Sequence, residues 1–197
     1  MKKVALTIAA SLFITGFVFA TVEGDTDQGT ATHSVSIVIP TVALVDVESE
    51  DGGEAGTINL TPSTGSLEAG EAVDFGTATN NKLWLNYTSV VDAGDNAERQ
   101  ITVALDNEDN LPEGVSLLVS AGSITSGKGK KGSAAEGKVT ISATAQNLVT
   151  GIGSCYTETG SGKGHQLTYE LDMNENEYAN LVAETYDVQI TYTITGE

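Results

Sequence analysis

Apolar and polar residues alternate along much of the chain with a period of two residues. The clearest run is 82–90, in which Leu83, Leu85 and Tyr87 fall on one side. This period is typical of strands with one buried face, so each such run predicts a strand. The same alternation occurs at residues 71–75, 99–106, 115–120, 138–144, 165–172 and 186–195.

These strands are short, and Gly, Asn, Asp and Ser turns separate them, which predicts an all-β protein. We expect a single antiparallel β-sandwich, Ig-like or jelly-roll-like, of about 8–10 strands. No run has sustained helical periodicity, and no alternation of strands and helices predicts a parallel sheet. Residues 178–184 suggest a single helical turn. The domain is expected to cover residues 34–197, with an N-terminal extension at its start.

The most apolar and β-branched stretch after the first twenty residues is 33–47, HSVSIVIPTVALVDV. Pro40 divides it into two strand-like pieces. Because proline cannot donate to a central ladder, we expect a break there. Residues 34–39 would be free to leave their own domain, and residues 42–47 would stay. The stretch 34–47 is therefore a candidate donor strand, whose apolar side chains are Val35, Ile37, Ile39, Val42 and Leu44.

Residues 1–20 have the features of a secretory signal peptide. Lys2 and Lys3 precede an apolar run, and small residues at positions 18 and 20 fit cleavage before Thr21. Residues 21–33 are then a polar, acidic and flexible leader. We expect a secreted protein, extracellular or at the cell surface. No second apolar run approaches the length of a membrane span, so membrane insertion is not expected.

The net charge of the chain limits the kinds of partner that it can bind. It has 27 acidic and 9 basic residues, and loss of Lys2 and Lys3 with the signal leaves a formal charge of −20. Such a protein is not expected to bind nucleic acid or anionic membranes. Lys128, Lys130 and Lys131 stand in a Gly-rich stretch, 126–138, which predicts an exposed, mobile loop. It is either a basic docking loop for an acidic surface, including another copy, or an ordinary hairpin tip.

No convincing catalytic set is present, and we do not expect an enzyme. Cys155 is the only cysteine, so an intrachain disulfide is impossible, and burial as a small apolar residue is expected. His165 is the only histidine after it, in a strand-and-turn context that would not activate a thiol. Residues 122–128 have the spacing of a phosphate-binding loop, but Gly129 stands where Ser or Thr is required.

Cofactors are not expected, apart from one calcium hypothesis. Asp106, Glu108 and Asp109 offer clustered oxygen ligands, although the order of an EF-hand loop is missing. Acidic loops are also normal on so acidic a protein. Both readings stay open at this point.

Five sequence segments resemble segments of known proteins: IPTVALVDVE at 39–48, LWLNYTS at 83–89, GIGSCYT at 151–157, GHQLTYEL at 164–171 and ITYTIT at 190–195. Together they resemble small exported bacterial all-β proteins with no assigned activity. More loosely, the chain is similar to β-sandwich fimbrial subunits, which have an apolar N-terminal extension and end in an alternating, tyrosine-containing strand. It departs from them in lacking a disulfide and in ending with Gly196-Glu197.

This resemblance and the donor stretch lead to the first hypothesis, a structural subunit of a surface filament or pilus-like fibre. The donor strand of one copy would complement a sheet edge of the next copy, giving a head-to-tail homopolymer. The acceptor edge would be formed by Val188, Ile190, Tyr192 and Ile194. The alternative is a monomeric adhesion or carbohydrate-binding module that contacts surface glycans through residues 106–114 and 126–138, with or without calcium.

Overall fold

The computed structural model describes residues 29–65, 67–94 and 97–196. The expected signal peptide, and residues 21–28 of the expected leader, lie outside the described residues. The chain divides into two units, residues 1–38 and 39–197. In the first unit, residues 29–38 adopt no regular secondary structure and are exposed. The second unit contains the strands.

Within the described residues, nine strands and three short 3-10 helices are present. The strands are β1 (Val42–Ser49), β2 (Thr79–Val90), β3 (Arg99–Leu105), β4 (Val115–Ala121), β5 (Lys128–Ala134), β6 (Val139–Thr140), β7 (Gln146–Tyr156), β8 (His165–Met173) and β9 (Ile190–Gly196). The 3-10 helices are η1 (Phe75–Thr77), η2 (Glu108–Asn110) and η3 (Glu175–Asn180). Among these residues, no helix is both long and apolar enough to cross a membrane.

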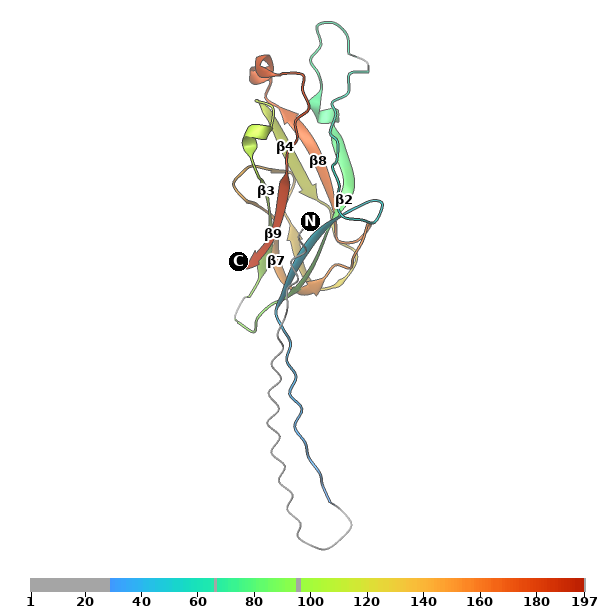
Figure 1. Cartoon of the computed structure of the whole chain (residues 1–197), viewed down its shortest axis with the longest axis vertical. Helices are drawn as coiled ribbons and strands as arrows, with labels where there is room; N and C mark the ends of the chain where they lie inside the picture. Colours follow the sequence, from blue (N-terminus) through green and yellow to red (C-terminus); the bar gives the residue numbers. More distant parts are fainter. Residues whose placement is uncertain (1–28, 66, 95–96, 197) are drawn as a thin grey trace, which may run out of the picture. The chain divides into compact units, whose positions relative to one another are not determined.

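All described strand pairs are antiparallel and belong to one sheet, with the order β6-β4-β8-β2-β7-β3-β9. β1 pairs with β2, and β5 pairs with β7, outside this path. Along one edge, β2 pairs first with β8, at Leu83↔Leu167, and then with β7, at Ser89↔Cys155. The sheet therefore branches at β2 (Figure 1).

The two branches face each other across one core. The hydroxyl oxygens of Tyr169 in β8 and Tyr192 in β9 lie 2.5 Å apart, although β2, β7 and β3 stand between these strands in the sheet order. The buried core draws on both branches: Leu83, Leu85, Tyr87, Ile101, Val103, Leu105, Leu117, Val119, Ile141, Leu148, Val149, Ile152, Cys155, Leu167 and Tyr169. The predicted all-β class is confirmed; hydrogen bonds join the strands into one continuous sheet, not two separate ones.

Alternation predicted several strands and their buried faces correctly. Leu83, Leu85 and Tyr87 of β2 are buried, as are the three apolar residues of β3 and the first two of β8. Of the two strand-like pieces predicted around Pro40, only the second forms a strand, since β1 begins at Val42 and residues 33–39 have no regular secondary structure. The strand predicted at residues 71–75 does not form. These residues lead into η1 instead, and the Asp74 side chain caps η1 by accepting a hydrogen bond from the Gly76 amide. β6 and β9 are shorter than predicted.

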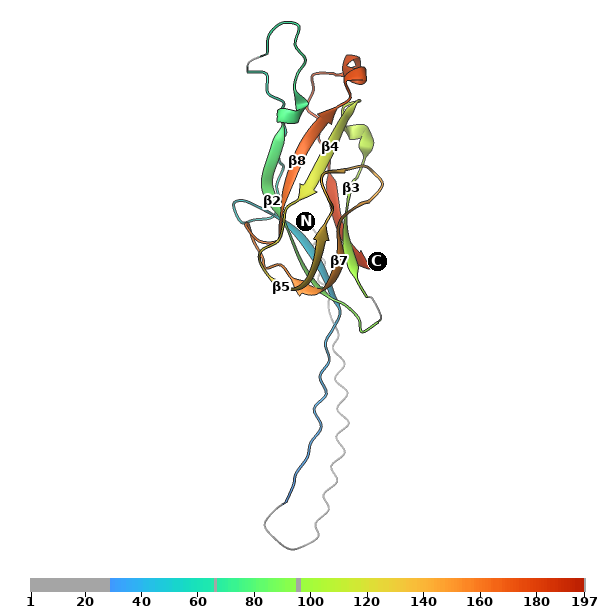
Figure 2. The same cartoon turned by 180° about the vertical axis from the view of Figure 1, so that it is seen from behind.

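The prediction of a mobile loop at 126–138 is wrong for residues 128–134, which form β5 against β7 (Figure 2). Glycines explain how this stretch pairs so closely. Gly129 has a φ of 92°, and a Cβ atom there would lie 2.3 Å from the Ser154 carbonyl oxygen. Only a residue without a side chain allows that approach.

Candidate functional site

The predicted donor stretch has two parts with different environments. Val35, Ile37 and Ile39 are 72%, 81% and 76% exposed and lie outside any strand. Val42 and Leu44 belong to β1, where they pair with Val90 and Thr88 of the same chain. Large aliphatic side chains in such a regular, exposed row are an unsatisfied apolar surface. The donor segment is therefore defined here as residues 34–39.

The opposite element of the hypothesis, β9, is an edge strand. It ends the sheet order, and within the described residues only β3 pairs with it. The Asp106 amide donates to the Gln189 carbonyl at 3.0 Å, which fixes the odd-numbered residues as those whose backbone groups face β3. In an antiparallel ladder the intervening residues face away. The backbone groups of Ile190, Tyr192 and Ile194 therefore point to the unpaired edge.

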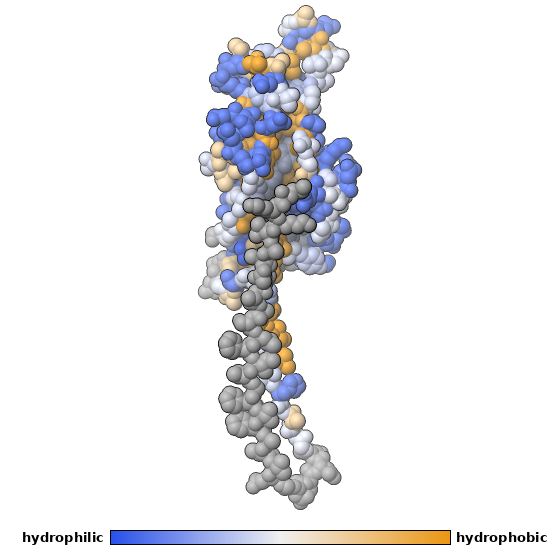
Figure 3. All heavy atoms as spheres, viewed as in Figure 1, coloured by the Kyte–Doolittle hydropathy of each residue, from blue (hydrophilic) through white to orange (hydrophobic). Residues whose placement is uncertain are grey.

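An apolar groove lies beside this edge, with a volume of about 1230 Å³. Its floor is formed by side chains of β2, β4 and β8: Leu83, Val115, Leu117, Tyr169 and Leu171. One wall is residues 55–62, and the other is residues 181–190 together with Tyr192. Figure 3 shows apolar side chains reaching the surface on this face of the domain. Half-buried Ile58, Leu60, Val188 and Ile190 pack against the core from these walls.

Both walls contain backbone that no strand uses. Residues 57–62 and 181–189 have no regular secondary structure. Val47 accepts a hydrogen bond from the Ala55 amide. After Ala55, no backbone pairing with another described residue occurs before the bridge between Ser63 and Asp74. Free backbone beside an apolar floor offers an added strand both hydrogen bonds and side-chain pockets.

The floor of the groove is sealed by the Tyr169–Tyr192 hydroxyl contact. Tyr169 is only 2% exposed, and burial raises its pKa to about 12. Burial also raises the pKa of Tyr192, and the neighbouring Tyr169 adds to that shift. Both phenols are therefore neutral at physiological pH. They present a small polar point in an otherwise apolar surface.

The four predicted acceptor residues do not all lie at the groove. Val188, Ile190 and Tyr192 line the groove, whereas Ile194 packs against the core beyond it. The groove itself was missed by sequence reasoning, because its walls come from irregular chain. A weak signal exists at residues 57–60, where Ile58 and Leu60 alternate with polar neighbours.

The predicted basic docking residues are held within their own chain. Lys130 pairs with Glu98, and the Lys131 ammonium donates to the Ser126 carbonyl at 2.5 Å. Lys128 is exposed at the start of β5. These residues form part of a strand, whereas the sequence predicted an exposed, mobile loop.

The predicted calcium ligands are not brought together. Asp106 accepts a hydrogen bond from the Thr191 hydroxyl at 2.7 Å, and Glu108 accepts one from the Ala143 amide. Asp109 lies in η2, whose start is capped by Asn107. Among the residues that the structure describes, no three His, Cys, Asp or Glu side chains are placed to hold a metal ion. These carboxylates instead fix the turn after β3.

Cys155 is buried and carries no disulfide. Burial raises the pKa of its thiol, an effect that Lys131 partly offsets. His165 points to Tyr87 and Gly122 through its two ring nitrogens. This arrangement explains both residues as parts of the core.

Comparison with known proteins adds no relative. No protein-family model, no curated protein and no solved structure matches this chain.

Proposed function

We propose that this chain is an exported structural subunit that polymerises by β-strand donation. The donor segment of one copy lies in the apolar groove of the next copy and pairs with the free edge of β9. Because the two surfaces are different, each new copy exposes a fresh groove and a fresh donor, and the contact propagates.

The observation that carries this proposal is the match between the two surfaces. The groove offers an apolar floor and an unpaired strand edge. The donor segment offers alternating apolar side chains and a backbone that pairs with no strand among the described residues. Strand addition needs both features: the backbone provides attraction, and alternate side chains provide register.

Magnitudes show that side chains alone do not suffice. Burying Val35, Ile37 and Ile39 contributes about 1.5–3 kcal/mol each, or roughly 5–9 kcal/mol together. Association costs on the order of 4–15 kcal/mol in lost freedom. Backbone hydrogen bonds to β9, at about 1 kcal/mol each, must therefore contribute. The proposal thus depends on pairing with the strand edge as well as on filling the groove.

Filament formation by the chain starting at Thr21 provides the test, with electron microscopy and size-exclusion chromatography as readouts. A truncated chain that starts at residue 41 keeps β1 and should remain monomeric. Ile37→Asp should also abolish filaments, because it places a carboxylate on the apolar floor. Ser36→Asp adds the same charge on the opposite face of the donor and should still polymerise.

Folding of each variant is checked by its far-UV circular dichroism and thermal melt, which should match the parent chain. Filaments from the truncated chain would show that donation by this segment is wrong. A strictly monomeric parent chain would also contradict the proposal, and it would favour a monomeric glycan-binding module.

A further inference from the structure

The groove also determines which way the donated strand runs. We infer that the donor segment lies antiparallel to β9, with Ile39 toward η3 and Val35 toward Tyr192. This inference rests on the proposed function. It defines the polarity of the assembly, which strand donation by itself leaves undecided.

The first argument concerns the end of the groove near β1. Cα atoms of β1 and β9 approach within 8 Å, although no ladder joins these two strands among the described residues. A strand between them would need about 9.5 Å, twice the usual spacing. The groove lining accordingly includes Tyr192 and Val47 but not Ile194. A strand that follows β9 must leave the groove at this end.

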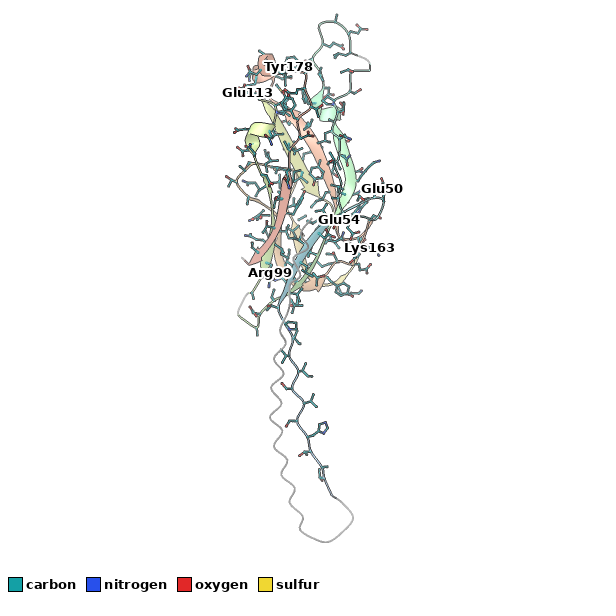
Figure 4. All side chains as sticks on the ribbon, viewed as in Figure 1. Glu50, Glu54, Arg99, Glu113, Lys163 and Tyr178 are labelled. Carbon is teal, nitrogen blue, oxygen red and sulfur yellow. The ribbon has the colours of Figure 1, made fainter. Side chains whose placement is uncertain are left out.

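The second argument concerns what is attached to each end of the donor. Its N-terminal side continues into the polar residues 29–33, which are slender and can leave over the surface. Its C-terminal side continues into a folded domain after only Pro40 and Thr41. The bulky end therefore fits the other end of the groove, beside η3. Figure 4 places Tyr178 at that end of the domain and Arg99 at the opposite end.

Pairing energetics agree with this direction. β9 runs from Ile190, nearer η3, toward Gly196. A donor with Ile39 near η3 is then antiparallel to β9, like every described pair in the sheet. Parallel pairing is somewhat less stable per residue. It would also bring the β1 ends of two copies together, where reciprocal donation could close a dimer and stop growth.

The inferred direction makes a second contact between copies unavoidable. Ile39 and Val42 are three residues apart and can be separated by at most about 11 Å. The first strand of the incoming copy therefore begins close to the η3 end of the acceptor. Val182 and Tyr178, which are 63% and 38% exposed, lie at that end. We expect the incoming domain to cover them and to make the joint rigid.

Disulfide trapping between two copies tests the direction. If the apolar donor residues face Val188, Ile190 and Tyr192, antiparallel pairing sets Ser34 opposite Thr193. Parallel pairing sets Ser34 opposite Asp187. All three positions are exposed. Ser34→Cys is mixed with Thr193→Cys in one reaction and with Asp187→Cys in the other, under mild oxidation.

The expected result is a disulfide-linked dimer in the Thr193→Cys mixture, severalfold more abundant than in the Asp187→Cys mixture. Cys155 is buried, so the parent chain should give only background adduct. Filaments with preferential linkage to Asp187→Cys, or with linkage to neither, would overturn the inferred direction and leave strand donation standing. Absence of filaments would instead count against the proposed function. The experiment thus distinguishes a wrong strand direction, with filaments present, from a wrong proposed function, with filaments absent.

Discussion

His165 lies at the centre of a buried chain of hydrogen bonds. Its Nδ1 is 2.5 Å from the Gly122 carbonyl oxygen, and its Nε2 is 3.2 Å from the Tyr87 hydroxyl. That hydroxyl donates to the Lys131 carbonyl at 2.5 Å. A neutral histidine that donates to Gly122 leaves Nε2 as an acceptor, so the single Tyr87 hydroxyl proton is shared between Nε2 and the Lys131 carbonyl. The network therefore ties β2, β5 and β8 together with a neutral imidazole.

Stability should therefore fall when the medium becomes mildly acidic. Burial lowers the pKa of His165 below 6.5; the nearby Lys131 charge lowers it further, and the bond to Gly122 opposes both. Tyr87 and Cys155, the other titratable groups around it, are neutral in this range because burial raises the pKa of each. Just below pH 6.5 the His165 imidazole binds a proton in the unfolded chain but stays neutral in the folded chain. The free energy of unfolding should then drop by at most about 1.4 kcal/mol per pH unit.

Urea unfolding between pH 5.5 and 7.5 measures this effect. The contribution of neutral His165 to the free energy of unfolding is fully present above pH 6.5, and it declines as the pH falls toward the lowered pKa of the folded state. His165→Gln should flatten the pH dependence in this window, whereas His33→Gln, in the exposed segment, should leave it as in the parent chain. Equal slopes for His165→Gln and the parent would show that His165 does not carry the effect.

At the scale of elements, alternation succeeded where one strand face is buried and the ladder is regular. β2, β3 and β8 meet that condition. β7 escaped prediction because Leu148 and Val149 are both buried, and the register of β7 with β3 shifts between Arg99 and Thr102. A shifted register breaks the period of two. The alternation of apolar and polar residues in the sequence does not reveal such a shift in register.

β5 failed as a prediction for another reason, and its glycines supply a test. Gly129→Ala combines a φ of 92° with a clash against Ser154, whereas Gly137→Ala has a similar φ of 78° and no atom within 4 Å. Gly137→Ala should cost about 1 kcal/mol of unfolding free energy, from the positive φ alone. Gly129→Ala should cost at least about 2 kcal/mol more. Denaturant melts of both variants measure the difference; equal losses would mean that β5 does not pack closely on β7.

Two strands that each have one described partner, β5 and β9, differ in a way that the sequence does contain. β5 carries Lys128, Lys130 and Lys131, and charged side chains, lysine above all, discourage edge-to-edge pairing. β9 carries no charged residue. Alternation thus predicted the apolar rows at residues 35–39 and 188–194, and three residues of the second row, Val188, Ile190 and Tyr192, line the groove. The groove itself could not be predicted, because residues 55–62 and 181–189 become its walls only through the tertiary fold.

At the scale of the whole molecule, the proposed assembly requires chains that start at Thr21, with a formal charge of −20, to approach one another. The donor segment and its neighbours, residues 29–41, contain no acidic residue. Local pairing is therefore free of repulsion, but the domains still repel through their summed charge. Repulsion between exposed charges is screened over about 10 Å at 0.1 M salt and over about 3 Å at 1 M. Ionic strength should therefore control the rate of assembly.

We expect polymerisation, followed by light scattering, to accelerate steeply as sodium chloride rises from 10 to roughly 300 mM and then to level off as the Debye length shrinks. Neutralising exposed carboxylates away from the groove, as in Asp51→Asn with Glu50→Gln, should shift this curve to lower salt. Ser36→Thr, which changes no charge, should leave the curve in place. A rate that is indifferent to salt, or that falls with it, would mean that net charge does not limit the approach of subunits. Attraction at the groove would then have to dominate from the first encounter.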